Sequence, residues 1–141
     1  MNKPLALALS WLLIAAPALA ESSAHCPATN AIKIRGGVYT APVGDGGEWL
    51  GIAAPGSGGR VQRFDSAILY PAQGGHPARF GKCTYRLQTG LVGLRFKPGN
   101  AEPAARRAGA NVWIRQEGPF SLVYDECRET DPTQCAFLYT D

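Results

Sequence analysis

Two histidines and a small set of serines are the residues of this chain that could form a nucleophilic catalytic site. His25 lies beside Cys26, and His76 lies in a turn-forming run, Gly74-Gly75-His76-Pro77. A serine nucleophile needs a base within hydrogen-bond reach and a third group that orients the base. The G-x-S-x-G motif is also missing, because Pro55 stands in the first glycine position before Gly56-Ser57-Gly58. The sequence therefore predicts no serine hydrolase and, more broadly, no enzyme.

Four cysteines carry the strongest chemical signal: Cys26, Cys83, Cys127 and Cys135. An even number of cysteines in an exported domain is typical of disulfides, and four cysteines allow three pairings. We favour Cys127–Cys135 because the seven residues between them include Asp131-Pro132 and can reverse the chain. That choice leaves Cys26–Cys83 as the second bridge. No C-x-x-C spacing of the zinc type is present, so we expect neither a metal nor another cofactor.

Carboxylates suggest two weaker possibilities. Asp45, Glu48 or Asp65 could serve a glycoside hydrolase, but only if two of them faced each other across a groove. A second acidic group lies near the end of the chain and could hold calcium weakly: Asp125, Glu126, Glu129 and Asp131. It lacks the D-x-D-x-D-G order of a calcium loop, so we interpret it as a solvated acidic loop. A carboxylate-dependent hydrolase is the least favoured function.

Tryptophan and arginine provide the candidate binding residues. Trp49 follows a glycine-rich loop, and Trp113 alternates with Val112 and Ile114 next to Arg115. If Val112 and Ile114 face the core, Trp113 faces outward beside Arg115, a composition typical of protein-binding hot spots. The alternative places Trp113 inside, because tryptophan is strongly buried on average. We predict Trp49, Trp113 and Arg115 as binding residues.

The first twenty residues have the pattern of a secretory signal peptide. Lys3 supplies the positive start, residues 5–16 are apolar apart from one serine, and Ala18-Leu19-Ala20 fits the cleavage pattern. We expect cleavage after Ala20, a single domain over residues 21–141, and a periplasmic or secreted location. No later apolar run is long enough to span a bilayer, so no membrane anchor is expected. Loss of Lys3 lowers the net charge from +3 to about +2, too small an excess to predict nucleic-acid binding or a polybasic membrane patch.

The elements that must position these residues are short. Seventeen glycines and eleven prolines interrupt the chain, so long helices have little room. Residues 82–87 and 91–96 alternate apolar and polar positions around Gln88-Thr89-Gly90, which predicts a hairpin. Further strands are expected over residues 31–35, 49–52, 67–70, 111–116, 121–124 and 136–139. About seven strands predict an all-β fold, a small antiparallel sandwich or barrel.

One segment could form a short helix. Residues 102–108 have a proline at an initial position and Gly109 as a stop signal, so we expect at most one or two helical turns there. Such a helix would be marginal by itself because of its length.

Several short motifs resemble a family of small exported proteins of Gram-negative bacteria, a domain of unknown function. The resemblance rests on these motifs: Cys26-Pro27, Gly36-Gly37-Val38-Tyr39-Thr40-Ala41, Gly47-Glu48-Trp49-Leu50-Gly51, Cys83-Thr84-Tyr85, and Cys127 with Cys135-Ala136-Phe137. It implies an extracytoplasmic, disulfide-bonded β domain. The motifs are structural, so the resemblance carries over no active residues.

The leading functional hypothesis is a non-enzymatic module that binds another extracytoplasmic protein, as an inhibitor or immunity protein does. Loops on a rigid, disulfide-pinned sheet would form its binding surface. The alternative is a carbohydrate- or cell-wall-binding domain in which Trp49 and nearby tyrosines stack on sugar rings.

Overall fold

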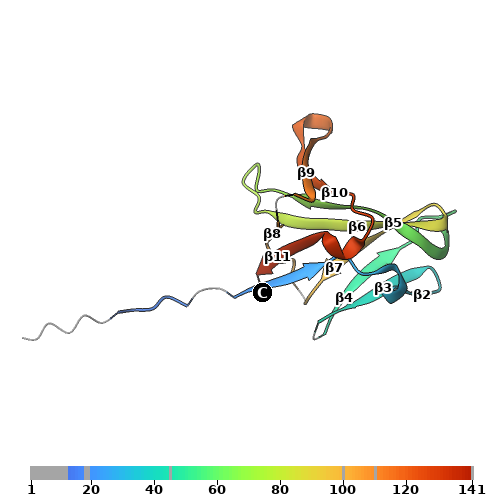
Figure 1. The fold of residues 1–141 in the computed structure, drawn as a ribbon, viewed down its shortest axis with the longest axis horizontal. Coiled ribbons are helices and arrows are strands. Elements are labelled where there is room, and N and C mark those ends of the chain that lie inside the picture. The colour runs from blue at the N-terminus through green and yellow to red at the C-terminus, as the bar shows by residue number, and fades with distance from the viewer. Residues whose placement is uncertain (1–12, 18–19, 45, 100, 110, 141) are drawn as a thin grey trace, which may run out of the picture.

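The computed structural model describes residues 13–17, 20–44, 46–99, 101–109 and 111–140. Its strands form two antiparallel sheets (Figure 1). The large sheet contains, in spatial order, β2 (Lys33–Arg35), β3 (Val38–Val43), β4 (Gly47–Ile52), β7 (Leu91–Lys97), β6 (Arg79–Thr89), β5 (Gly58–Tyr70), β10 (Val123–Cys127) and β9 (Trp113–Glu117). The small sheet contains β1 (Glu21–His25), β11 (Ala136–Thr140) and β8 (Ala105–Arg107). Three single 3-10 turns complete the described elements: η1 (Thr29–Ala31), η2 (Pro119–Ser121) and η3 (Pro132–Gln134).

The all-β prediction is confirmed, and the described residues form eleven strands where about seven were expected. The β6–β7 hairpin has the expected connection, in which Gly90 has φ of 75° and accepts a 2.9 Å hydrogen bond from the Leu87 amide. A non-glycine residue rarely adopts this backbone conformation, so the glycine in the sequence predicted the position of the turn. The glycine-rich loops mark the starts of β4 and β5 rather than long connections.

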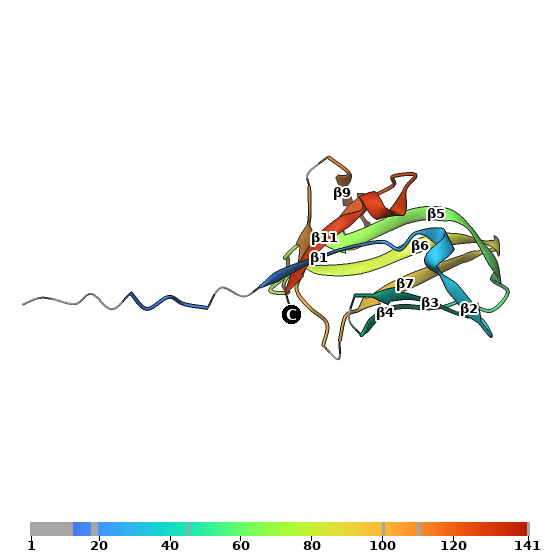
Figure 2. The same ribbon diagram turned by 60° about the horizontal axis from the view of Figure 1, so that its bottom comes forward.

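The small sheet packs on the concave side of the large sheet (Figure 2). Aromatic rings from both sheets meet between them. The ring of Phe137 stacks on Phe80 with centroids 4.1 Å apart and makes an edge contact with Trp49 at 6.2 Å. Phe96 lies 5.0 Å from Phe137 and 4.8 Å from Tyr139. This cluster forms an open sandwich core, and the large sheet does not close into a barrel.

The short helix that the sequence allowed over residues 102–108 does not form. Residues Ala105–Arg107 instead form β8, which pairs with β11 through Tyr139 opposite Ala105 and Phe137 opposite Arg107. Ala105 is buried while its arginine neighbours are exposed. An isolated helix of this length gains little, whereas an edge strand obtains backbone partners and buries Ala105.

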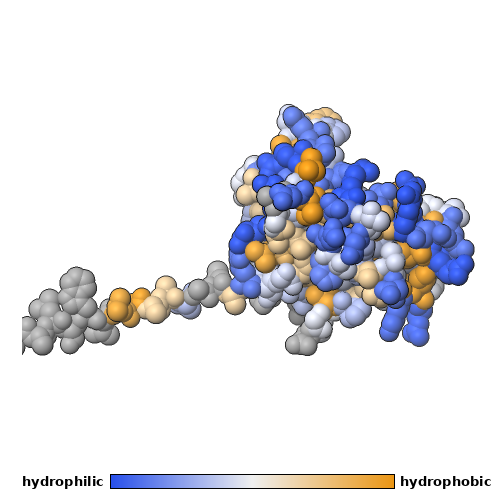
Figure 3. All heavy atoms as spheres, in the orientation of Figure 1, coloured by the Kyte–Doolittle hydropathy of each residue, from blue (hydrophilic) through white to orange (hydrophobic). Residues whose placement is uncertain are grey.

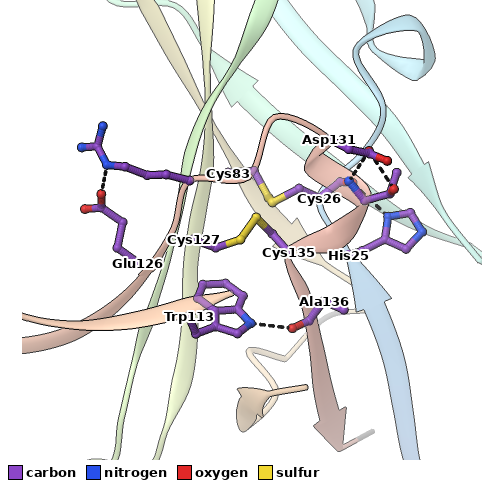
Figure 4. Close-up of a disulfide and its surroundings, with 11 residues drawn as sticks. His25, Cys26, Cys83, Trp113, Glu126, Cys127, Asp131, Cys135 and Ala136 are labelled. Atoms are coloured by element: carbon purple, nitrogen blue, oxygen red, sulfur yellow. Dashed lines mark hydrogen bonds and ion pairs between the residues drawn. A yellow bond between two sulfur atoms is a disulfide. The ribbon is translucent and has the colours of Figure 1, made fainter. Parts of the chain in front are cut away.

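Both disulfides have the favoured pairing. Cys26 is bonded to Cys83 and Cys127 to Cys135, with Cα–Cα distances of 5.9 and 5.8 Å (Figure 4). The first bridge joins the segment after β1 to the middle of β6, where the buried Tyr85 hydroxyl donates a 2.6 Å hydrogen bond to a backbone carbonyl near the bridge. Burial raises the pKa of Tyr85, so this hydroxyl keeps its proton. Two disulfides indicate an oxidising, extracytoplasmic environment.

Residues 13–17 lie away from the folded body (Figure 1 and Figure 3). Leu13 and Ile14 are 95% and 90% exposed, so this part of the expected signal peptide is not buried against the domain. The remainder of that prediction, residues 1–12 and 18–19, lies outside the described residues. Within the described part of the chain, no helix is long and apolar enough to span a bilayer.

Candidate binding site

A two-stranded arm, residues 113–127, rises from the body of the protein (Figure 1). It contains β9, β10 and the turn between them. Only the inner half of β10 pairs with β5, from Asp125 opposite Leu69 to Cys127 opposite Ala67. The outer half of the arm therefore has no neighbouring strand from the body.

The tip of the arm presents a phenylalanine. Phe120 is fully exposed, at 104% of its reference area, and both Phe120 and Ser121 have positive φ angles, 57° and 58°. The turn is closed by hydrogen bonds from the Gly118 amide to Leu122 O (2.7 Å) and from the Leu122 amide to Pro119 O (3.2 Å). Non-glycine residues at positive φ persist only where the surrounding structure determines them, and they cluster at functional sites.

The base of the arm is rigidly attached. Cys127 is bonded to Cys135, and the Trp113 indole Nε1 donates a 2.8 Å hydrogen bond to Ala136 O (Figure 4). One step further out, Arg115 Nε donates a 2.6 Å hydrogen bond to the Oδ1 atom of Asp125, its cross-strand partner. These contacts connect both strands of the arm to each other and to the small sheet.

Gln73 braces the arm where β5 has ended. Its side-chain Nε2 donates a 2.6 Å hydrogen bond to Val123 O, and its Oε1 accepts a 3.1 Å bond from the Val123 amide. One side-chain amide thus takes the place of a neighbouring strand. Gln73 is itself fixed by reciprocal backbone bonds with His76, of 3.1 and 3.0 Å. The turn over residues 71–78 and the arm are therefore held together.

A cleft of about 460 Å³ lies beside this brace, where Leu122 of the arm faces the turn. Its polar lining includes Gln73, His76, Arg79 and Glu102, and the Arg79 guanidinium lies 4.4 Å above the ring of Tyr70. The cleft combines the cationic Arg79, neutral polar groups, a carboxylate acceptor and apolar walls. Such a lining can bind polar side chains of a partner next to the exposed tip.

The two predicted tryptophans lie in the core. Trp49 and Trp113 are each 2% exposed, and Ile114, at 56%, is the outward residue of β9. The prediction that Trp113 faces outward is therefore wrong. Its ring packs inward, as the alternative had it. Strand alternation allows only one of Trp113 and Ile114 to face the core, and the larger ring gains more from burial. Neither indole presents a ring face to a ligand.

Arg115 is the predicted binding residue that reaches solvent. Its side chain is 54% exposed, while that of its partner Asp125 is 3% exposed. The hydrogen bond to Asp125 raises the pKa of Arg115, so the guanidinium stays protonated. Arg115 lies on the arm between its base and its tip, so it belongs to the candidate binding surface.

The carboxylates are distributed among structural contacts. Glu126 pairs with Arg128, and Asp131 Oδ1 accepts hydrogen bonds from the amide and the hydroxyl of Thr133, which lower the pKa of Asp131. Among the described residues, no three potential metal ligands come together. Of the possible catalytic acids, Asp45 lies outside the described residues. Glu48 is on β4 and Asp65 on β5, with β7 and β6 between them, so these two acids do not face each other across a groove.

Sequence reasoning missed Phe120 and Gln73. An apolar ring in the turn Gly118-Pro119-Phe120-Ser121, where polar residues are usual, was a readable signal for the tip. Gln73 gave no signal, because its partner is a backbone group fifty positions away.

The fold and the arm define a class: a disulfide-bonded, all-β domain with a projecting, braced hairpin. The chain belongs to the family described as protein of unknown function (DUF3757), whose model matches residues 20–138. No curated protein and no solved structure matches it.

Proposed function

We propose that this protein is an exported, disulfide-stabilised binding module that recognises another extracytoplasmic protein through its arm. The observation that carries the proposal is Phe120, fully exposed in a left-handed conformation at the tip of a braced hairpin. A buried phenylalanine contributes about 1.5–3 kcal/mol relative to an exposed one, and this domain leaves that contribution unused.

Preorganisation supports the proposal. The disulfide at Cys127, the Arg115–Asp125 ion pair and the Gln73 brace fix the arm before any partner arrives. A rigid loop loses less conformational entropy on binding than a flexible one. Aromatic and arginine side chains are enriched at protein interfaces, and the arm exposes both Phe120 and Arg115. An inhibitor or immunity protein would use such a projecting element to enter a partner's groove.

Export is part of the proposal. The signal-peptide pattern ends at Ala20, β1 begins at Glu21, and the family match begins at residue 20. These coinciding boundaries support cleavage after Ala20 and an exported, periplasmic or released product.

The test compares two exposed apolar residues. The mature chain, residues 21–141, is used to capture partners from an extracytoplasmic extract, alongside the variants Phe120→Ala and Ile52→Ala. Ile52 is 73% exposed and lies far from the arm on β4, so its replacement controls for loss of surface hydrophobicity. We expect wild type and Ile52→Ala to recover the same protein, and Phe120→Ala to bind it at least tenfold more weakly, as for a hot-spot residue. Equal recovery by all three would contradict the proposal.

The sugar-binding alternative loses its main support from this placement. Its stacking platform was Trp49, whose ring contacts Phe80, Phe96 and Phe137 in the core.

A further inference from the structure

We propose that the outward face of the large sheet binds the surface of an anionic phospholipid bilayer. The basic face is defined by five cationic side chains from β2, β7 and β6: Lys33, Arg35, Lys82, Arg95 and Lys97. The proposal is independent of the arm, which lies at the other end of the sheet order.

Strand register brings these side chains together. Lys33 is opposite Thr40, Thr40 is opposite Leu50, and Leu50 is opposite Arg95, so one row crosses four strands. Side chains directly opposite each other in a sheet lie on the same face, about 5 Å apart.

Neighbouring rows extend the face. Arg35 begins a second row, opposite Val38 and then Ile52, while Lys97 ends a third row opposite Glu48. The aliphatic stem of Lys82 lies across Gly93 of β7. A Cβ added to that glycine would lie only 3.0 Å from Lys82 Cδ, so the glycine leaves room for this stem.

Burial confirms that this is the outward side. The alternating residues Tyr39, Trp49, Leu94 and Phe96 are buried, whereas all five cations of the basic face are exposed. None of the five forms an ion pair with a carboxylate among the described residues, where the ion pairs involve Arg86, Arg106, Arg115 and Arg128. Glu48 lies opposite Lys97 on the same face, so the charge of the other four cations is available to an external anion.

The small net charge of the chain conceals this segregation. Residues 33–97 contain nine basic residues (lysine or arginine) and three acidic ones. Residues 98–141 contain four basic residues and seven acidic ones. The first segment forms β2 to β7, and the second contributes the arm, β8 and β11. A cationic surface is thus set apart from an acidic one, and it can attract an anionic partner despite the low total charge.

The apolar residues of the basic face favour lipid over other polyanions. Ile52 is 73% exposed between the cations, Leu50 is half-buried, and the rows described above contain no aromatic side chain. Single-stranded nucleic acids are bound through stacking on aromatic rings. Aliphatic side chains beside lysine and arginine instead suit the boundary between headgroups and acyl chains.

A hollow on this face gives headgroups a place to bind. It has a volume of about 730 Å³ and is lined by Lys33, Arg35, Thr40 and two aliphatic residues. Two cations and a hydroxyl can donate hydrogen bonds to phosphate oxygens there.

The test uses vesicles and no protein partner. The mature chain is sedimented with vesicles of phosphatidylglycerol and phosphatidylcholine, and with vesicles of phosphatidylcholine alone. The variant Lys82→Gln/Arg95→Gln removes two charges from the basic face. The matched control, Arg106→Gln/Arg107→Gln, removes two charges from β8 in the small sheet.

We expect binding to the anionic vesicles only, and its loss at high salt, where exposed charges are screened. Lys82→Gln/Arg95→Gln should bind about 30-fold more weakly, because each cation near an anionic surface contributes about a factor of five. The control and Phe120→Ala should bind as wild type does. Equal binding to neutral vesicles, equal loss in the two double variants, or tighter binding to DNA than to anionic vesicles would each overturn the proposal. Because no partner protein is present, failure of this test leaves the arm proposal standing.

Discussion

Replacing Gln73 with leucine should release the arm from the body. Leucine has a similar size but cannot form the two hydrogen bonds between the Gln73 amide and the Val123 backbone, of 2.6 and 3.1 Å. A hydrogen bond of this kind contributes about 1 kcal/mol, so the brace contributes about 2 kcal/mol. Because Val123 is half-buried, water can replace part of the loss, and a larger effect is not expected.

Hydrogen exchange measures this effect at the atom concerned. The Val123 amide donates directly to Gln73 Oε1, so its exchange reports opening of the brace. A change of about 2 kcal/mol corresponds to exchange about 30-fold faster in Gln73→Leu than in wild type. The Leu94 amide, in the centre of the large sheet, should change much less, because the arm opens as a local unit.

Gln116→Leu is the matched control, since Gln116 is exposed on β9 and has no side-chain hydrogen bond among the described contacts. It should leave Val123 exchange unchanged. The reasoning is refuted if Gln73→Leu and Gln116→Leu give the same Val123 rate, or if Val123 and Leu94 accelerate equally, because the brace would then not be a local support.

Three further outcomes follow from the same contacts. Replacing Cys127 and Cys135 by serine should lower the free energy of unfolding by about 2–3 kcal/mol, since the bridge closes a short loop, and an unchanged urea midpoint would contradict this. Phe120→Gly should raise the melting temperature slightly, because glycine adopts the 57° φ without strain, while it abolishes partner binding; a lower melting temperature would refute the strain argument. The ion pair with Arg106 lowers the pKa of Glu21, so this pair stabilises the folded state above the ordinary glutamate pKa and the contribution is lost as the pH falls through the lowered value. The stability difference between wild type and Glu21→Gln should therefore vanish in acid, and a difference that grows in acid would have the wrong sign.

Much of the fold followed from local sequence. The β6–β7 hairpin was predictable because apolar alternation on both sides flanked a glycine placed for positive φ. The disulfide pairing followed from the short loop between Cys127 and Cys135. In both cases the determining contacts lie close together along the chain.

The elements that failed depend on distant partners. Residues 102–108 have helical composition, but β11 supplies strand partners for Ala105–Arg107 from thirty residues away. Trp113 could face either way on the sequence alone, and its orientation is decided by the space beneath β9 and by the carbonyl of Ala136. Local propensity gave no information about either partner.

The candidate surfaces were less predictable than the fold. Arg115 was identified, but its use depends on the arm that Gln73 braces across fifty positions. The net charge did not predict the basic face, because only the strand register places Lys33, Leu50 and Arg95 in one row.

Position-specific crosslinking in the native extracytoplasmic compartment tests the central claim most directly. A photoreactive phenylalanine analogue is introduced at Phe120 and, separately, at Ile52, two exposed sites on opposite parts of the domain. The account predicts one discrete protein adduct from position 120 and no protein adduct from position 52. Adducts to the same proteins from both positions, or no protein adduct from position 120, would contradict it.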